Sequence, residues 1–221
     1  GGGESNDDNL IKYYSNIANI EKFKSASVSP VDLAPFDFVV VSNFILLSEE
    51  SKSYLMDNKK YIIYEHDHKY VKTRDPSKYV NFDIPEGDIV NRDFYVNAHM
   101  VVVLSKICKE VLLKNIPECK VHSIGCSLWS DEKLDLIEKL SSNKKYGFCI
   151  MKSNNPTKNY HSTIKFCNDR GLEPTHIQSS SHDKFLEMLS KHKTLIFLPT
   201  VLETFSRLCV EAKMLGLSTL T

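Results

Sequence analysis

Thr194-Leu-Ile-Phe-Leu-Pro199 is followed by a short loop and then by Glu203-Thr-Phe-Ser-Arg-Leu-Cys-Val-Glu211. The stretch predicts a buried strand, a tight loop and a helix with one glutamate at its start and another in its body. A helix entered in this way directs free backbone N–H groups and the positive end of its dipole at the space above the strand. Because these groups attract negative charge, the stretch predicts an anion site.

The two glutamates suggest which molecule carries the anion. Glu203 is expected at the mouth of the helix and Glu211 about two turns further in. Carboxylates at these places can accept hydrogen bonds from two hydroxyl-bearing groups that flank a bound phosphate. A nucleotide-sugar has this layout, with a sugar, a diphosphate and a ribose. A purely structural role stays open, because glutamate near a helix start also favours the dipole.

Short apolar runs alternate with helix-like stretches along the rest of the chain, which predicts parallel α/β architecture. We expect two Rossmann-like domains, 1–128 and 129–221, that face a cleft at the carboxyl ends of their strands. A single doubly wound domain is the alternative. The predicted strands cover 36–41, 61–64, 100–104, 121–124, 147–151, 176–178, 194–198 and 217–221. The predicted helices cover 6–20, 48–58, 106–114, a stretch opened by Ser130, 160–170, 183–191 and the stretch after Glu203. Residues 67–96 are expected to form a long loop with one short helix.

The C-terminal stretch resembles the E-x7-E motif of retaining glycosyltransferases with the GT-B fold, specifically family four. Between Pro199 and Gly216 it keeps both glutamates, Phe205 and Ala212 of that pattern. The resemblance implies metal-independent transfer of a sugar from a nucleotide-diphosphate-sugar to an acceptor hydroxyl, with retention of configuration. It also implies that the first domain serves the acceptor and the second binds the donor, and that the chain is shorter than a whole family member at both ends.

The resemblance gives each residue of the motif a role. Glu203 is expected to bind the donor sugar as a catalytic residue, and Glu211 to bind the ribose hydroxyls. The backbone of Thr204, Phe205 and Ser206 is expected to hold the diphosphate. Nearby, residues 179–181 are expected to line the pocket of the nucleobase.

Two lysines fit the same family pattern. Lys152 directly follows the predicted strand 147–151, and Lys158 comes later in the same polar loop. In the family, cations at these places contact the donor diphosphate, and they would stabilise the charge that grows as the glycosidic bond breaks. Asn159 stands where the family usually has glycine. Lysines in polar loops are ordinarily solvated, which is the structural alternative.

Two sites in the N-terminal half complete the resemblance. Residues 1–4 resemble the family's Gly-Gly-x-Glu loop, in which glycines such as Gly2 and Gly3 let backbone N–H groups approach the donor phosphates. Glycines at a chain start are also a common tag remnant. His66 follows a predicted strand and is the second expected catalytic residue, near the anomeric carbon, with Asp67 and His68 as close rivals. The His-x-His spacing also invites a metal site, but with no third ligand cluster we expect none.

Composition limits the class of protein. The chain has 221 residues with 28 basic and 28 acidic side chains, so no basic excess points to a nucleic-acid partner. No apolar run reaches the length of a bilayer span, no signal peptide opens the sequence, and the six cysteines lack C-x-x-C pairing. We therefore predict a cytoplasmic protein with no transmembrane segment, and peripheral membrane contact is left open.

Absent motifs remove other enzyme classes. The sequence has no Asp-x-Asp, no G-x-G-x-x-G, no P-loop and no G-x-S-x-G. These absences weigh against GT-A transferases, dinucleotide oxidoreductases, P-loop NTPases and α/β-hydrolases. We expect no cofactor beyond the nucleotide-sugar donor, and a carbohydrate or lipid-linked acceptor. Two alternatives remain: a nucleotide-sugar-binding module without catalysis, and a nucleotide-sugar epimerase of GT-B architecture. Trp129, near the expected joint, is predicted to pack between the domains.

Overall fold

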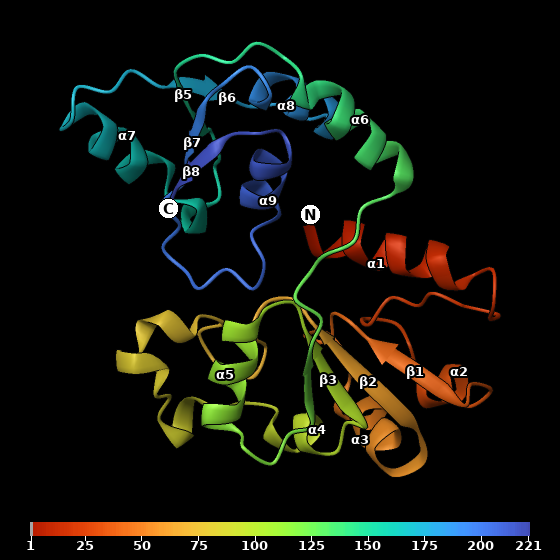
Figure 1. Cartoon of the computed structure of the whole chain (residues 1–221). Coiled ribbons are helices and arrows are strands. Elements are labelled where there is room, and N and C mark those ends of the chain that lie inside the picture. The colour runs from red at the N-terminus through yellow and green to blue at the C-terminus, as the bar shows by residue number, and fades with distance from the viewer. Residues whose placement is uncertain (1) are drawn as a thin grey trace. The chain divides into compact units, whose positions relative to one another are not determined.

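The computed structural model describes residues 2–221 (Figure 1). The chain divides into two compact units, the first ending at Leu128 and the second running from Trp129 to Thr221. Each unit contains one four-stranded parallel sheet with helices packed on it. This architecture confirms the predicted α/β class with two Rossmann-like halves, and the cleft between them stays a prediction.

The sheet of the first unit has the strand order β1-β2-β3-β4, and every neighbouring pair is parallel. Its strands are rich in valine and isoleucine, as expected for a parallel sheet that is covered on both faces. Ile63 and Val101 are fully buried and lie opposite each other in the register of β2 and β3. The strands are β1 (Phe38–Val41), β2 (Lys60–Glu65), β3 (Met100–Val103) and β4 (Val121–Ser123).

Serine caps start two helices of this unit. The hydroxyl of Ser48 accepts a hydrogen bond from the N–H of Ser51, and that of Ser105 accepts one from Cys108. Serine is favoured at this position because its oxygen satisfies a helix donor that has no partner within the helix. The helices are α1 (Gly2–Tyr14), α2 (Pro30–Leu33), α3 (Glu49–Asn58), α4 (Arg92–Val96) and α5 (Lys106–Asn115), and the 3₁₀ turns are η1 (Pro76–Lys78), η2 (Val80–Phe82) and η3 (Glu86–Asp88).

The start of the chain differs from the sequence prediction. The predicted helix covers 6–20, whereas α1 already begins at Gly2, so the implied loop at residues 1–4 is wrong for its described part. Gly1 lies outside the described residues. A helix can begin here because the N–H groups of a first helical turn have no partner within the helix, wherever the helix starts. The carboxylate of Glu4, which lies in that turn, interacts favourably with the helix dipole. Gly2 and Gly3 are therefore helical residues.

The sheet of the second unit has the order β6-β5-β7-β8, again all parallel. The chain leaves β5 for β6 on one side and then crosses to β7 on the other, so the direction of winding reverses between β5 and β7. In open α/β sheets, ligands bind outside the carboxyl ends of the strands at such a switch point. The elements are β5 (Phe148–Met151), β6 (Thr175–Ile177), β7 (Thr194–Ile196), β8 (Ser218–Leu220), α6 (Asp131–Ser141), η4 (Pro156–Lys158), α7 (Tyr160–Asn168), α8 (His182–Leu189) and α9 (Arg207–Met214).

The helix that decides the site starts later than predicted. The sequence predicts a helix beginning at Glu203, but α9 begins at Arg207. Ser206 is its N-cap, and its hydroxyl accepts a 3.4 Å hydrogen bond from the N–H of Cys209. The cap explains the late start, because serine bonded to the backbone favours a helix end over a helix interior. Glu203 therefore lies in the loop before α9, and Glu211 lies in the second turn of the helix.

Candidate functional site

Two loops meet at the switch point of the second unit, one after β5 and one after β7. The amide of Asn159 donates a 2.8 Å hydrogen bond to the carbonyl of Leu198, and the N–H of Thr200 donates one of 3.1 Å to the carbonyl of Thr157. Asn159 has a φ of 54°, a left-handed conformation that glycine and asparagine tolerate best. This explains why asparagine can stand where the resembling family has glycine.

Lys158 and Glu203 form an ion pair across these loops. Lys158 Nζ lies 2.7 Å from Glu203 Oε1, and the two side chains are 29% and 20% exposed. The ammonium also lies 5.7 Å from the centre of the Phe197 ring. A partly exposed pair of this kind contributes little to folding. Its ammonium can therefore exchange the carboxylate for a phosphate at small cost.

The other predicted phosphate-binding residues lie in the loops that follow β5 and precede α9. Lys152 directly follows β5, its N–H donates to the carbonyl of Ile177 at 2.9 Å, and its side chain is exposed. Thr204, Phe205 and Ser206 lie in the loop that leads into α9, and all three are partly buried. The hydroxyl of Ser206 is engaged in the cap.

Glu211 is buried, with only 3% of its surface exposed. Its Oε1 accepts a 2.8 Å hydrogen bond from the indole N–H of Trp129, and its Oε2 lies 3.0 Å from His182 Nε2. The Arg207 guanidinium lies 4.4 Å from the centre of the Trp129 ring, and Phe205 meets that ring edge-on at 6.3 Å. Trp129 thus packs within the second unit, on the motif helix. A partly buried indole N–H usually finds an acceptor, and Glu211 is the acceptor here.

A second cluster lies at the carboxyl edge of the first sheet, around His66. His66 follows β2, and its Nε2–H donates a 2.9 Å hydrogen bond to Asp7 Oδ1 on α1. Asp7 Oδ2 accepts a 2.6 Å bond from Ser42, which follows β1. A Cβ on Gly3 would lie 3.4 Å from His66 Cγ, so Gly3 packs against the imidazole. The fold brings Gly3 and His66 together, whereas Gly2 is exposed at the start of α1.

The two rivals of His66 contact other residues of the first unit. His68 is 2% exposed, and its Nδ1 lies 3.3 Å from the hydroxyl of Tyr70. Asp67 forms ion pairs with Lys69, at 2.5 Å, and with Arg74. His66 is joined to α1 through its hydrogen bond to Asp7.

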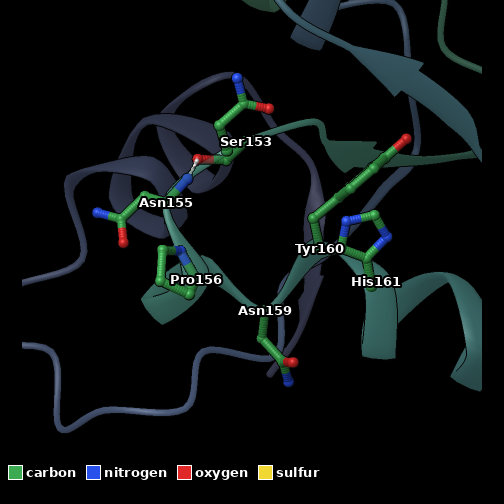
Figure 2. A pocket seen from close by; sticks show the side chains of 7 residues that line it. Ser153, Asn155, Pro156, Asn159, Tyr160 and His161 are labelled. Atoms are coloured by element: carbon green, nitrogen blue, oxygen red, sulfur yellow. Dashed lines mark hydrogen bonds between the residues drawn. The ribbon is translucent and has the colours of Figure 1, made fainter.

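A pocket of about 380 Å³ lies beside the loop that follows β5 (Figure 2). Its walls are residues 153–156 and 159–161, from that loop and the first turn of α7. Figure 2 shows the N–H of Asn155 bonded to the hydroxyl of Ser153, at 3.1 Å. Neither Lys158 nor Glu203 lines this pocket. It is separate from the ion pair at the switch point.

Two geometric findings concern residues 2–221 alone. Within this range, no group of three histidine, cysteine or acidic side chains is arranged to hold a metal ion. Within the same range, every helix is too short or too polar to cross a bilayer. Metal-independent transfer stays a prediction.

Asp7 was missed by the sequence analysis, and its two hydrogen bonds lead to a prediction. Asp7→Ala is expected to lower the free energy of unfolding by about 1–3 kcal/mol, because partly buried Ser42 and His66 lose their acceptor. Asp8→Ala is the matched control, since the neighbouring Asp8 pairs with Lys22 at the surface. Urea unfolding of both variants checks the difference. Equal midpoints would show that the Asp7 contacts add nothing to stability.

The comparisons with known proteins come from structures. A scan against models of protein families found no match, and a search of curated proteins found none either. OtsA in its apo form is similar over 84% of this chain and 58% of its own, with 7% identity and a TM-score of 0.56. HepE of Anabaena, in complex with UDP and glucose, is similar over 99% and 76%, with 15% identity and a TM-score of 0.56. An α,α-trehalose-phosphate synthase (UDP-forming) from Burkholderia vietnamiensis is similar over 97% and 67%, with 8% identity and a TM-score of 0.52.

The chain thus spans between 58% and 76% of the length of these structures. At such low identities the likeness concerns the fold and leaves activity open. The chain has the α/β fold of the GT-B glycosyltransferases, built from two Rossmann-like units.

Proposed function

We propose that this chain is a glycosyltransferase that moves a sugar from a nucleotide-diphosphate-sugar to an acceptor hydroxyl. The observation that carries the proposal is the Lys158–Glu203 pair at the switch point between β5 and β7. A cation and a carboxylate in contact there provide one group for a phosphate and one for a sugar hydroxyl. The GT-B fold adds support, since HepE, which shares it, is in complex with UDP and glucose.

The second unit, 129–221, would bind the donor. Lys158 leaves Glu203 and bonds the diphosphate, together with Lys152 and the backbone N–H groups of residues 204–206. Fixed cations and amides at this place stabilise the negative charge that the diphosphate gains as it departs. The freed Glu203 accepts a hydrogen bond from a hydroxyl of the donor sugar. Glu211 and the groups bonded to it lie at the ribose end.

The first unit, 1–128, would serve the acceptor, a carbohydrate or a lipid-linked one. His66, held by Asp7 and packed against Gly3, supplies the group near the anomeric carbon. The bond from the anomeric carbon to the phosphate oxygen breaks, and the acceptor oxygen forms the new bond on the same face. The departing phosphate takes the acceptor's proton. This retaining, family-four type of chemistry, and a cytoplasmic location, are parts of the proposal that rest on sequence.

A thermal-shift screen with UDP, ADP, GDP and CDP tests the donor site. One of the four, with UDP as the first choice, is expected to raise the melting temperature. At 100 times its Kd, a ligand that binds only the folded state stabilises it by about 2.7 kcal/mol. The matching nucleoside without phosphates is the control, and its shift is expected to be much smaller. Four diphosphates without any shift would refute the proposed donor site.

The products then separate the three readings of the sequence. Transfer yields a glycosylated acceptor and free nucleoside diphosphate. An epimerase releases the nucleotide and an altered sugar in the absence of any acceptor. A binding module leaves the donor intact whether or not an acceptor is added.

A further inference from the structure

Asn6, on α1, is fully buried and holds the chain at the point where it leaves the first unit. Its Oδ1 accepts a 2.7 Å hydrogen bond from the N–H of Leu128 and a 3.0 Å bond from the hydroxyl of Ser127. Its Nδ2 donates to the hydroxyl of Tyr64 on β2. Asn9, about one turn further along α1, donates a 3.3 Å bond to the carbonyl of Leu128. Both backbone polar groups of Leu128, the last residue of the first unit, are thus bound to one helix.

Trp129 is the next residue, and it belongs to the second unit. Its indole N–H donates to Glu211 on α9, and its ring lies 4.4 Å from the Arg207 guanidinium. Ser130, the residue after it, is already the N-cap of α6. Among the described residues the chain passes between the units at this one place, so the Leu128–Trp129 peptide joins the two anchors. Because a peptide is planar, rotation there is limited to the backbone bonds on its two sides.

We propose that Asn6 is a positioning residue for sugar transfer, which acts by confining the motion between the two units to this one peptide. The inference rests on the proposed function, since transfer needs groups of both units at one donor. Each anchor is joined to one half of the proposed site. Asp7, next to Asn6 on α1, holds His66, and Trp129 is bonded to α9. Rotation at the peptide, which acts as the hinge, moves each half of the site as one body.

Loss of the Asn6 side chain would lengthen the free link between the units. The strand contacts of the first sheet end at Ile124, whose N–H donates to the carbonyl of Val103 at 3.0 Å. Residues 125–128 then run to the unit boundary, and Asn6 is bonded to the last two of them. Without these bonds residues 125–128 are expected to join the link, and a longer flexible link allows a wider range of separations between its ends. The reacting groups would then meet less often in the productive geometry.

Distances between spin labels, one on each unit, test the role of Asn6. The labels are attached at Asp57→Cys on α3 and at Lys165→Cys on α7, two exposed positions. Every chain also carries Cys126→Ser, because this thiol is exposed. Asn6→Ala is expected to broaden the distribution of label distances. Asn6→Asp keeps an oxygen that can accept the same hydrogen bonds, so it is expected to restore the distribution of the chain with Asn6.

Asn115→Ala is the matched control. Asn115 is also a buried asparagine of the first unit, 7% exposed, and its Oδ1 accepts a 2.8 Å bond from the N–H of Ile84 while its Nδ2 donates to two carbonyls. Its loss should lower stability to a similar extent and leave the label distances unchanged. A distribution that Asn6→Ala leaves unchanged, or that Asn115→Ala broadens equally, would overturn the role of Asn6.

A milder variant covers the case in which Asn6→Ala does not fold. Asn9→Ala releases the carbonyl of Leu128, and it is expected to broaden the distribution to a smaller extent. Label distances that stay unchanged in this variant would then overturn the proposal.

Binding and turnover connect the anchor to the reaction. The proposed donor site lies on the second unit, so Asn6→Ala should leave the Kd of UDP, or of another diphosphate that the screen selects, unchanged. Release of that diphosphate from the matching nucleotide-glucose should fall about tenfold or more, because a displacement of about 1 Å at the reacting groups can cost about a hundredfold. Asn115→Ala should keep the rate. Unchanged turnover in Asn6→Ala would overturn its positioning role while the donor site stands. Failure of the wild-type chain to bind any diphosphate would overturn the proposed function, and the label distances would still decide whether Asn6 anchors the chain.

Discussion

Lys158→Ala is expected to lower the rate of sugar transfer by about 10²–10³-fold, the usual effect of removing one fixed group that stabilises charge in the transition state. The ammonium is the cation that the fold directs to the switch point, where it contacts Glu203 at 2.7 Å. Without it, the departing diphosphate loses a charge-assisted hydrogen bond. Steady-state kinetics with the donor chosen by the thermal-shift screen measures the loss.

Stability should change little in the same variant. Lys158 and Glu203 are both partly exposed, so water solvates the remaining carboxylate and the melting temperature should fall only slightly. Lys165→Ala, at an exposed lysine on α7, is the matched control and is expected to keep full activity. Unchanged turnover in Lys158→Ala would contradict the assigned phosphate role. A large drop in melting temperature would instead mean that the pair is structural.

Glu65→Ala is expected to destabilise the first unit by about 3 kcal/mol or more, as does the removal of one partner from a buried ion pair. Glu65 and Lys69 are 2% and 1% exposed, and Lys69 Nζ lies 3.0 Å from Glu65 Oε1. The hydroxyl of Tyr95 donates to Oε2 of the same carboxylate. Alanine would leave both donors in the interior without this acceptor, although Asp67 would remain near the ammonium. Urea unfolding measures the loss.

Replacing both partners is the control for this buried pair. Glu65→Leu with Lys69→Met removes both charges and keeps similar volume, which is often neutral for stability. The double variant is therefore expected to be more stable than Glu65→Ala. A double variant that is as unstable as the single one would mean that packing, rather than the unpaired charge, causes the loss.

The same carboxylate gives a pH dependence. Burial by itself raises the pKa of Glu65, but the charge of Lys69 and the hydroxyl of Tyr95 outweigh it and hold the pKa below its usual value. The stabilisation from ionised Glu65 is fully present above the pKa of glutamate in the unfolded chain, about 4.3. It is lost as the pH falls toward the lower pKa of Glu65 in the folded chain. The urea midpoint of the wild-type chain should thus fall more steeply below about pH 4.3 than that of Glu65→Gln. Parallel curves would exclude Glu65 as a source of the acid sensitivity.

The strands were predictable because their signal is local. Runs such as Val101 and its neighbours in β3, or Leu195 and Ile196 in β7, are apolar, contain β-branched residues and are bounded by polar turns. The start of α9 was placed too early because the sequence did not reveal that Ser206 is the cap. Likewise, Glu4 and the two glycines before it do not reveal that α1 begins at Gly2.

The candidate site was predicted only in part, because a local sequence pattern does not show contacts between distant residues. Lys158 and Glu203 come together as the motif spacing suggested, since the loops that carry them follow β5 and β7, the two central strands of one sheet. The partners of the other site residues come from distant parts of the chain: Asp7 is 59 positions from His66, and Trp129 is 82 from Glu211. Such contacts depend on how whole elements pack, and no local pattern encodes them. His182 was missed because histidine in a serine-rich turn has no distinctive spacing.

A crystal structure of the chain with the nucleoside diphosphate that gives the largest thermal shift would test the proposed donor site most directly. We expect a β-phosphate oxygen at about 3 Å from Lys158 Nζ and from a backbone nitrogen of residues 204–206, with the Lys158–Glu203 contact broken. A diphosphate bound elsewhere, for example in the pocket at the first turn of α7, with Lys158 still paired to Glu203, would contradict it.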